Sequence, residues 1–302
     1  MRSPVLDKSS EIIFRELKGV ISETDYTEFA AGRKENEKLT QTVFRTYNGE
    51  KISRLVFEQY TVNSKAYGVV LNIYPKPDSG IPIFTFQLGG QIPDKVIFVL
   101  DIIPVIHSEV DRGISDIYKK QVAGMQNLGS SQDWINQICS ENALICQYKP
   151  LNPEKILLAL TDYLCFWRDK YYLPEKPGIS AQAEKEAIGN ILKFKSLLRA
   201  NDSGLDIYLR KFGKEMVAVI ESAAFGSEPS LQGISGAATE QPDLSEETPT
   251  RSGDIVWTSD AEQYLQDAPK FVRSQIRNNA EKKALSMGIT NITREFIENL
   301  RK

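Results

Sequence analysis

Two strand-like segments of this sequence carry polar side chains that could take part in acid–base or hydrogen-bonding chemistry. Glu58 lies in the segment 52–60, where alternation places it on one face with Ile52, Arg54, Val56 and Tyr60. In the segment 83–88, Thr85 and Gln87 lie on the face opposite the large apolar residues Phe84, Phe86 and Leu88. Carboxyl and amide groups on one face of a sheet could line a cavity. The alternative, which these strands alone favour, is a sheet face open to solvent.

A third candidate is Asp202, which stands just before the apolar run that begins at Leu205. As an acid near a ligand it could deliver a proton. An aspartate before an apolar helical run is also typical of an N-cap, whose side chain accepts a hydrogen bond from the first turn. The local sequence favours the cap.

The other residue types that commonly do chemistry give weaker signals. The one histidine, His107, titrates near neutral pH, but it follows a turn, which favours a surface or loop role. The three cysteines, Cys139, Cys146 and Cys165, are odd in number and have no metal-ligand spacing. We therefore expect reduced thiols and no metal site.

The segments around Glu58 and Gln87 predict a sheet of sequentially adjacent strands. Runs of β-branched and aromatic residues, separated by turn residues, occur at 42–47, 52–60, 67–74, 83–88 and 96–102. A parallel crossover needs roughly a dozen residues, so these close neighbours must be antiparallel and form a meander. The pair Asn48-Gly49 predicts a type I′ hairpin turn.

Helical periodicity flanks the sheet. A first helix contains Ile12, Ile13 and Leu17 and is expected to begin at Ser9 or Ser10 as its cap. After the sheet, helices are expected at 114–125, 131–138, 153–170, 180–200 and 205–224, with a late strand at 143–148. Helices gathered after a sheet and packed on it define the α+β class.

Composition and charge limit the function classes. The chain of 302 residues is 41% hydrophobic and 25% charged, which is ordinary for globular proteins. A formal charge of -3, from 37 basic and 40 acidic residues, gives no overall attraction to nucleic acid. No signal peptide or membrane-spanning segment is predicted, so a cytoplasmic protein is expected.

The chain is expected to have two domains joined by a linker. The segment 227–253 is rich in Gly, Ser, Thr, Pro and acidic residues and lacks the apolar density that ordering requires. It separates an α+β domain at 1–226 from a small helical domain at 254–302. In that last domain Ser259 and Thr293 are expected to cap helices.

Two ordered segments carry a resemblance to a known family. The segment 73–105 contains Pro82-Ile83-Phe84 at a strand start and ends a strand in the pattern Asp-x-x-Pro, Asp101 to Pro104. Together with the segment 180–225, it resembles the ferredoxin-dependent bilin reductases and the related red chlorophyll catabolite reductases. The resemblance covers most of residues 40–226. It implies an α/β/α sandwich with a central, mainly antiparallel sheet flanked by helices.

The same resemblance implies a site and a chemistry. Those reductases bind an open-chain tetrapyrrole between the sheet and the C-terminal helices. They take electrons from reduced ferredoxin without a bound organic or metal cofactor. Asp202 and Glu58 match acids that serve that site, and we expect them to be catalytic. Gln87 stands where the family has its central acid, and Val70 where one branch has a histidine, so these two are expected to contact the substrate without donating protons.

The end of the chain resembles a different protein. The segment 256–300 is similar to the small C-terminal module of the light-independent protochlorophyllide reductase B subunit. The matching residues are Trp257, Ala261, Leu265, Pro269, Phe271, Val272, Arg273, Arg277, Glu281, Ala284, Gly288, Ile292, Thr293 and Glu295. Taken without the resemblance, Arg273 and Arg277 lie one turn apart and could dock a carboxylate or an acidic partner. A solvated helix face explains the same spacing and is favoured.

Two function classes follow. One is a ferredoxin-dependent reductase of a linear or chlorophyll-derived tetrapyrrole, with protons from Asp202 and Glu58. The other is a tetrapyrrole-binding protein without turnover, which assists chlorophyll metabolism or photosystem assembly. Gln87 and Val70 favour the binder, whereas Asp202 and the helical region favour the enzyme. Either class implies an oxygenic phototroph, with a cyanobacterium-like cytoplasm favoured over a plastid stroma.

Limited proteolysis tests the two-domain prediction. Brief trypsin or Glu-C digestion should cut between Gly226 and Gly253 and leave a stable N-terminal fragment, because acidic Gly/Ser/Pro segments are preferred cleavage sites. Mass spectrometry of the fragments locates the cuts. First cleavage inside the N-terminal α+β domain would contradict the predicted linker.

Overall fold

The structure of the protein is a computed structural model that describes residues 4–21, 26–91, 95–106, 112–123, 133–148, 152–175, 178–226, 256–267, 277, 280–281, 284 and 289–299. The chain falls into two compact units, Met1–Pro229 and Ser230–Lys302. The expected linker, His107, and the module residues Pro269, Phe271, Val272, Arg273 and Gly288 lie outside the described residues. Within the described part, no helix combines the length and the apolar content needed to cross a membrane.

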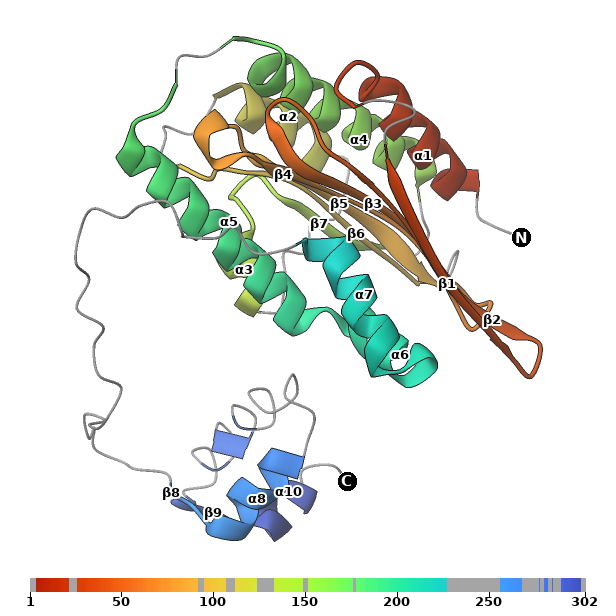
Figure 1. The fold of residues 1–302 in the computed structure, drawn as a ribbon, viewed down its shortest axis with the longest axis vertical. Helices are drawn as coiled ribbons and strands as arrows, with labels where there is room; N and C mark the ends of the chain where they lie inside the picture. Colours follow the sequence, from red (N-terminus) through yellow and green to blue (C-terminus); the bar gives the residue numbers. More distant parts are fainter. Residues whose placement is uncertain are drawn as a thin grey trace. The chain divides into compact units, whose positions relative to one another are not determined.

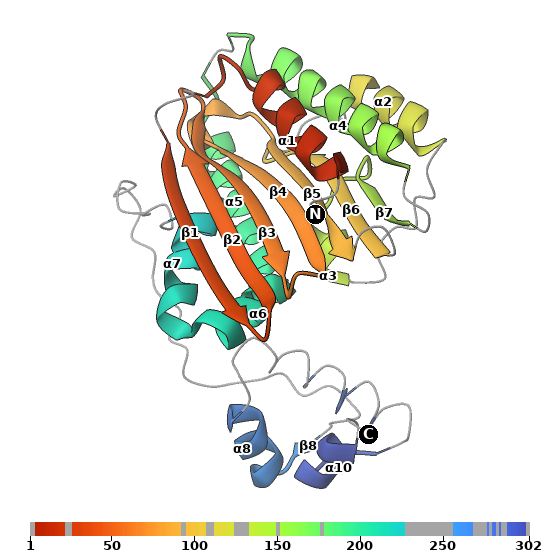
Figure 2. The same cartoon turned by 90° about the vertical axis from the view of Figure 1, so that its right-hand side faces the viewer.

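The first unit is built on a seven-stranded antiparallel meander in which every strand pairs with its neighbours in the chain. Its strands are β1 (Thr27–Glu35), β2 (Lys38–Tyr47), β3 (Ile52–Val62), β4 (Ala66–Pro75), β5 (Ile83–Gln91), β6 (Lys95–Ile103) and β7 (Leu144–Tyr148). The predicted meander is confirmed (Figure 2). β1 was not predicted, because its residues are mostly exposed and show no regular apolar alternation.

The tight hairpin turns lie at other positions than predicted. Positive φ at two consecutive residues occurs at Asn36 and Glu37 between β1 and β2, and at Asn63 and Ser64 between β3 and β4. The prediction of a type I′ turn at Asn48-Gly49 is wrong, because neither residue has a positive φ. A longer connection joins β2 to β3 there, and the Gly49 N–H donates to the Ile52 carbonyl at 3.1 Å.

Helices cover both faces of the sheet, which confirms the α/β/α sandwich (Figure 1). One layer contains α1 (Pro4–Glu16), α2 (Arg112–Val122) and α4 (Pro153–Trp167). The other contains α3 (Asp133–Ile138), α5 (Ala181–Asn201), α6 (Ser203–Phe212) and α7 (Lys214–Phe225). Each layer has its own apolar core, so both faces of the sheet are buried. A solvent-facing sheet surface, which the strand pattern alone favoured, is therefore wrong.

Most helix boundaries differ from the predicted ones by a few residues, and two differences have a clear structural cause. Ser9 and Ser10 do not cap α1 but lie inside it, where their hydroxyls donate to the Val5 and Leu6 carbonyls. The single helix expected at 205–224 is two helices, α6 and α7, which meet at Gly213 with φ 85°. A glycine tolerates this conformation, which a longer side chain would strain.

A β-bulge in β3 corrects the predicted face of Ile52. The pairing with β4 shifts between Ile52 and Arg54. Ile52 therefore packs with Leu55 and Phe57 in the core under α1 and α4, while Val56 packs in the core under α5–α7. The extra residue of a bulge changes the alternation, and a strict two-residue period could not show it.

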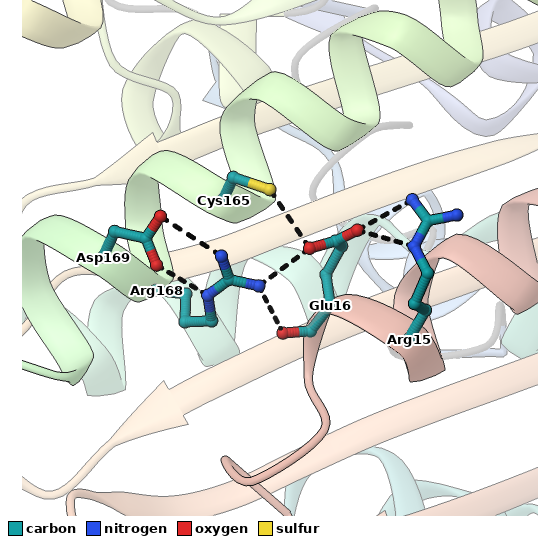
Figure 3. A network of polar contacts seen from close by, with 5 residues as sticks. All are labelled: Arg15, Glu16, Cys165, Arg168 and Asp169. Carbon is teal, nitrogen blue, oxygen red and sulfur yellow. Dashed lines mark hydrogen bonds and ion pairs between the residues drawn. The ribbon is translucent and has the colours of Figure 1, made fainter.

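A polar network ties the end of α1 to the end of α4 (Figure 3). The Glu16 carboxylate accepts hydrogen bonds from Arg15 at 2.7 Å, Arg168 at 2.7 Å and the Cys165 thiol at 3.2 Å. Arg168 also binds Asp169 and the Glu16 carbonyl. Burial and the hydrogen bond to Glu16 raise the pKa of Cys165 to about 11. The thiol is therefore a protonated structural donor.

The described residues of the second unit form a small separate core. Helices α8 (Ser259–Asp267) and α10 (Arg294–Asn299) pack with a two-residue parallel pair, β8 (Val256–Trp257) and β9 (Asn291–Ile292). Its buried residues are Ala261, Ala280, Ala284, Ile292 and Ile297. Thr293 caps α10, as predicted, by accepting from the Phe296 N–H at 3.2 Å. Ser259 is the first residue of α8 and not its cap.

Arg277 makes contacts within this unit that its spacing did not indicate. Its guanidinium binds both carboxylate oxygens of Glu262, at 2.6 and 2.8 Å, and lies 4.6 Å from the ring centroid of Trp257. The Trp257 indole N–H donates to Glu281 at 3.0 Å. The Arg277 side chain is 39% exposed, so it is partly solvated, and it also links α8 to β8.

Candidate functional site

Three of the four predicted site residues form one line across the sheet. Glu58 on β3 pairs with Val70 on β4, and Val70 pairs with Gln87 on β5. All three are half-buried and lie on the face covered by α5, α6 and α7. We call Glu58, Val70 and Gln87 the central row. The register places the three residues opposite one another on neighbouring strands, and cross-strand partners point to the same face of the sheet.

A second, fully buried polar line runs beside the central row and is structural. Thr85 donates to the Asn72 side chain at 2.7 Å. Asp101 accepts from the Ser140 N–H at 2.6 Å, the Ser140 hydroxyl at 2.5 Å and the Ile102 N–H at 2.8 Å. Burial raises the pKa of Asp101 to about 6 despite these hydrogen bonds. The aspartate of the Asp-x-x-Pro pattern therefore anchors the segment that follows α3.

The Glu58 carboxyl group is held by two hydroxyls. The Thr42 hydroxyl from β2 and the Tyr208 hydroxyl from α6 each donate to Glu58 Oε1 at 2.7 Å. Burial raises the pKa of Glu58 to about 7, although both hydrogen bonds lower it, and the nearby Asp202 carboxylate raises it further. Because Oε1 accepts both hydrogen bonds, Oε2 is the oxygen left to carry the proton. Glu58 is thus divided between acid and carboxylate at neutral pH.

Asp202 is the N-cap of α6 and also lies close enough to Glu58 for its charge to act on it. It ends α5 and caps α6, where its side chain accepts from the Gly204 N–H at 2.7 Å. Burial raises its pKa, against the effect of hydrogen bonds from the Gly204 and Leu205 backbone. Its charge also raises the pKa of Glu58. The N-cap is therefore confirmed, and the same carboxyl group lies in the electrostatic field of the central row.

Three hydroxyl-bearing residues of this site, Thr42, Tyr60 and Tyr208, were not predicted from the sequence. Tyr60 was placed on the face of Glu58, so its proximity could have been inferred from alternation. Thr42 pairs with Tyr60 across β2 and β3, which only the register shows. Tyr208 comes from 150 residues further along the chain than Glu58 and has no local signal.

Two cationic side chains, one from β3 and one from α5, hold the end of α7 in place. The Arg54 guanidinium donates to the Ala223 carbonyl at 3.1 Å and to the Ser222 carbonyl at 3.2 Å, and Lys195 donates to the Phe225 carbonyl at 2.7 Å. Cations at these last carbonyls of α7 suit the negative end of the helix dipole. The Tyr74 hydroxyl lies buried under the same helices and has no hydrogen-bond partner within the described part of the chain.

A surface depression between α2 and α4 lies in the other helix layer. It is lined by Ile117, Lys120, Asp162, Cys165, Phe166, Asp169 and Lys170. Its acid Asp162 accepts from Lys120 at 2.8 Å and from Gln121 at 2.6 Å. The depression contains none of the predicted site residues, and its ionisable groups are engaged in structural contacts. In the described ranges no group of three or more His, Cys, Asp or Glu side chains is arranged to hold a metal ion.

A comparison with solved structures matches the first unit. The chain aligns with the crystal structure of selenomethionine phytochromobilin synthase from tomato in complex with biliverdin, with a TM-score of 0.58 and 16% identity. The alignment covers 72% of this chain and 82% of the other. The fold of the first unit is therefore that of a bilin reductase, as the sequence resemblance implied.

A comparison of sequences matches the second unit. Residues 257–301 match the family described as the proto-chlorophyllide reductase 57 kD subunit. A segment of 48 residues in this C-terminal region is 48% identical to the B subunit of the light-independent protochlorophyllide reductase of Chlorobium chlorochromatii. A segment of 46 residues is 50% identical to that of Cereibacter sphaeroides. The match covers 9% of each relative. The chain thus joins a bilin-reductase fold to a module shared with a small part of these proteins.

The pKa of Glu58 makes stability depend on pH. An acid whose pKa is about 7 in the folded state and 4.5 in an unfolded chain binds its proton more tightly when folded. The free energy of unfolding should therefore fall as pH rises from about 4.5 to about 7, and this residue should account for roughly 2–3 kcal/mol of the fall. Glu58→Gln should flatten the profile by that amount in urea unfolding at several pH values.

Glu11→Gln is the matched control, because Glu11 is an exposed acid on α1 in the other helix layer. It should leave the wild-type slope unchanged. An unchanged slope in Glu58→Gln would show that Glu58 titrates at an ordinary pKa.

Proposed function

We propose that this protein binds a linear or chlorophyll-derived tetrapyrrole between the sheet and α5–α7, and that it reduces the tetrapyrrole with electrons from reduced ferredoxin. The observation that carries the proposal is that Glu58 is buried, held by two hydroxyls and partly protonated near neutral pH. Its pKa of about 7 makes it an effective general acid near neutral pH. The fold shared with phytochromobilin synthase supports the choice of ligand.

Glu58 takes the proton-donating role that Gln87 cannot fill. The two hydroxyls on Oε1 fix the carboxyl plane and leave the proton on Oε2, where it can reach a ligand above the central row. Gln87 contributes amide hydrogen bonds to a pyrrole nitrogen or a lactam oxygen. Val70, between them, offers an apolar contact to a flat ring system.

Asp202 serves as a second acid. Its carboxyl group interacts with Glu58 through space, and its charge raises the pKa of Glu58. Loss of the Glu58 proton makes the pair more negative, and this favours uptake of a new proton at either carboxyl group. Asp202 thereby helps to restore Glu58 for a second proton transfer while it continues to cap α6.

Ferredoxin and the two carboxyl groups supply all the electrons and protons that the reduction needs. Reduction of one carbon–carbon double bond consumes two electrons and two protons. Two reduced ferredoxin molecules supply one electron each and leave oxidised. Glu58 supplies one proton and Asp202, or Glu58 after reprotonation from solvent, supplies the other. The proposal requires no further bound cofactor.

The second candidate function is tetrapyrrole binding without turnover. It is favoured by the neutral side chains Gln87 and Val70 and by the C-terminal module, which the chain shares with protochlorophyllide reductase B subunits. Such a protein would hold or transfer a pigment during chlorophyll metabolism or photosystem assembly. It would bind pigment in the same place but would return it unchanged.

Anaerobic incubation of the pigment-loaded protein with reduced ferredoxin separates the two functions. Wild type should form a reduced pigment, detected by chromatography, and Glu58→Gln should lower the rate roughly 10²- to 10⁴-fold, as expected for loss of a general acid. Asp202→Asn should also lower the rate with little change in pigment affinity. Glu11→Gln should match wild type.

Two outcomes would contradict these roles. Turnover by Glu58→Gln at the wild-type rate would remove Glu58 from the mechanism. Product formation by Gln87→Asp but not by wild type would show a reductase fold that only binds pigment.

A further inference from the structure

A pair of glycines lies directly beside the central row. Gly68 on β4 and Gly89 on β5 are cross-strand partners, and Tyr60 on β3 pairs with Gly68. A Cβ atom built on either glycine would collide with the phenol of Tyr60. The Tyr60 ring therefore lies flat over β4, and its hydroxyl reaches β5. We call Gly68 and Gly89 the glycine seat.

Space, and not backbone conformation, explains these glycines. Neither Gly68 nor Gly89 has a positive φ, so another residue could adopt either backbone. Glycine inside a strand is unfavourable and often marks a close approach of another group. Two such residues opposite each other under one aromatic ring indicate that the ring's position is specified by the fold.

The position of the ring brings its hydroxyl to the site. The ring starts on the strand of Glu58 and ends beside Gln87, which interacts with the hydroxyl through a side-chain hydrogen bond. Tyr60 is half-buried, and Ile97, which pairs with Gly89 on the next strand, is 40% exposed. The hydroxyl end of the ring therefore lies toward the more exposed part of this sheet face.

We propose that the Tyr60 hydroxyl donates a hydrogen bond to the bound tetrapyrrole, at a lactam oxygen, and that the glycine seat holds it there. This inference rests on the proposed function and adds a binding residue to it. The hydroxyl lies over the glycine seat and beside Gln87, the position where this chain has no proton-donating acid. Burial, together with the charges of Glu58 and Asp202, raises the pKa of Tyr60, so the phenol keeps its proton and acts as a donor.

The absorption spectrum of bound biliverdin provides the test, because a hydrogen bond to a lactam oxygen changes the electronic structure of the conjugated system. Tyr60→Phe keeps the ring on the glycine seat and removes only the hydroxyl. It should shift the visible absorption of the bound pigment and weaken binding roughly 2- to 10-fold, the effect of one neutral hydrogen bond. Gly68→Ala and Gly89→Ala should shift the spectrum as well, since either Cβ displaces the ring.

Tyr67→Phe is the matched control. Tyr67 packs against the other core, and its hydroxyl donates to the Ser64 carbonyl at 2.7 Å. This variant should bind biliverdin with the wild-type spectrum and affinity. Circular dichroism checks that each variant folds, and Tyr60→Phe decides the question if a glycine variant does not.

The same experiments distinguish failure of the Tyr60 inference from failure of the proposed function. If wild type binds biliverdin and Tyr60→Phe shows the same spectrum and affinity, the inference about Tyr60 is wrong and the proposed function stands. If wild type binds no biliverdin, linear chlorophyll catabolite or protochlorophyllide, the proposed function fails, and the role of Tyr60 fails with it.

Discussion

The site depends on the burial of one carboxyl group between two hydroxyls. Glu58 lies on a central strand where ionisation is unfavourable, and Thr42 and Tyr208 both donate to the same oxygen of it. Burial disfavours the ionised form of Glu58, and the two hydrogen bonds keep its side chain from moving away. The carboxyl group is therefore fixed in position and remains partly protonated near neutral pH, which is the combination that a general acid requires.

The Glu58 carboxyl group is held by one hydroxyl from the sheet, that of Thr42, and one from the helix layer, that of Tyr208. Tyr208 reaches Glu58 because α6, which begins at Ser203 after its cap Asp202, lies over the sheet. The next helix, α7, is held by Arg54 and Lys195 at its last carbonyls. The N-cap of α6 thus has two consequences. It starts the helix that carries Tyr208, and it places a second carboxyl group in the field of Glu58.

Alternation and helical periodicity are local signals, and they were sufficient to predict the meander of the later strands and the helices around it. The helix layer on each face of the sheet was implied only by the resemblance to bilin reductases, since the strand pattern alone favoured an open face. The sequence was also sufficient to place Glu58, Val70 and Gln87 on strands, and the resemblance to bilin reductases marked them as site residues. The bulge before Arg54 and the turns at Asn36 and Asn63 were missed. The two turns have positive φ at Asn36 and Glu37 and at Asn63 and Ser64, and neither contains the glycine that marks a type I′ turn in a sequence.

Long-range contacts were beyond the reach of local patterns. Nothing near Tyr208 in the sequence indicates a bond to Glu58, and nothing near Gly68 or Gly89 indicates that Tyr60 covers them. For Asp202 the local pattern predicted the cap correctly but gave no information about the neighbouring acid. In the second unit, the spacing of Arg277 suggested an outward-facing group, whereas Trp257 and Glu262 engage it from elements distant in sequence.

The direct measurement is the pKa of Glu58 in the folded protein. Carbon-13 NMR of protein labelled at the glutamate side-chain carboxyl, with the Glu58 signal assigned by its loss in Glu58→Gln, follows this group alone through a pH titration. The account predicts a midpoint of about 7. A midpoint at or below 4.5, the ordinary value for glutamate, would show that the carboxyl is fully ionised at neutral pH and would contradict its assignment as the proton donor.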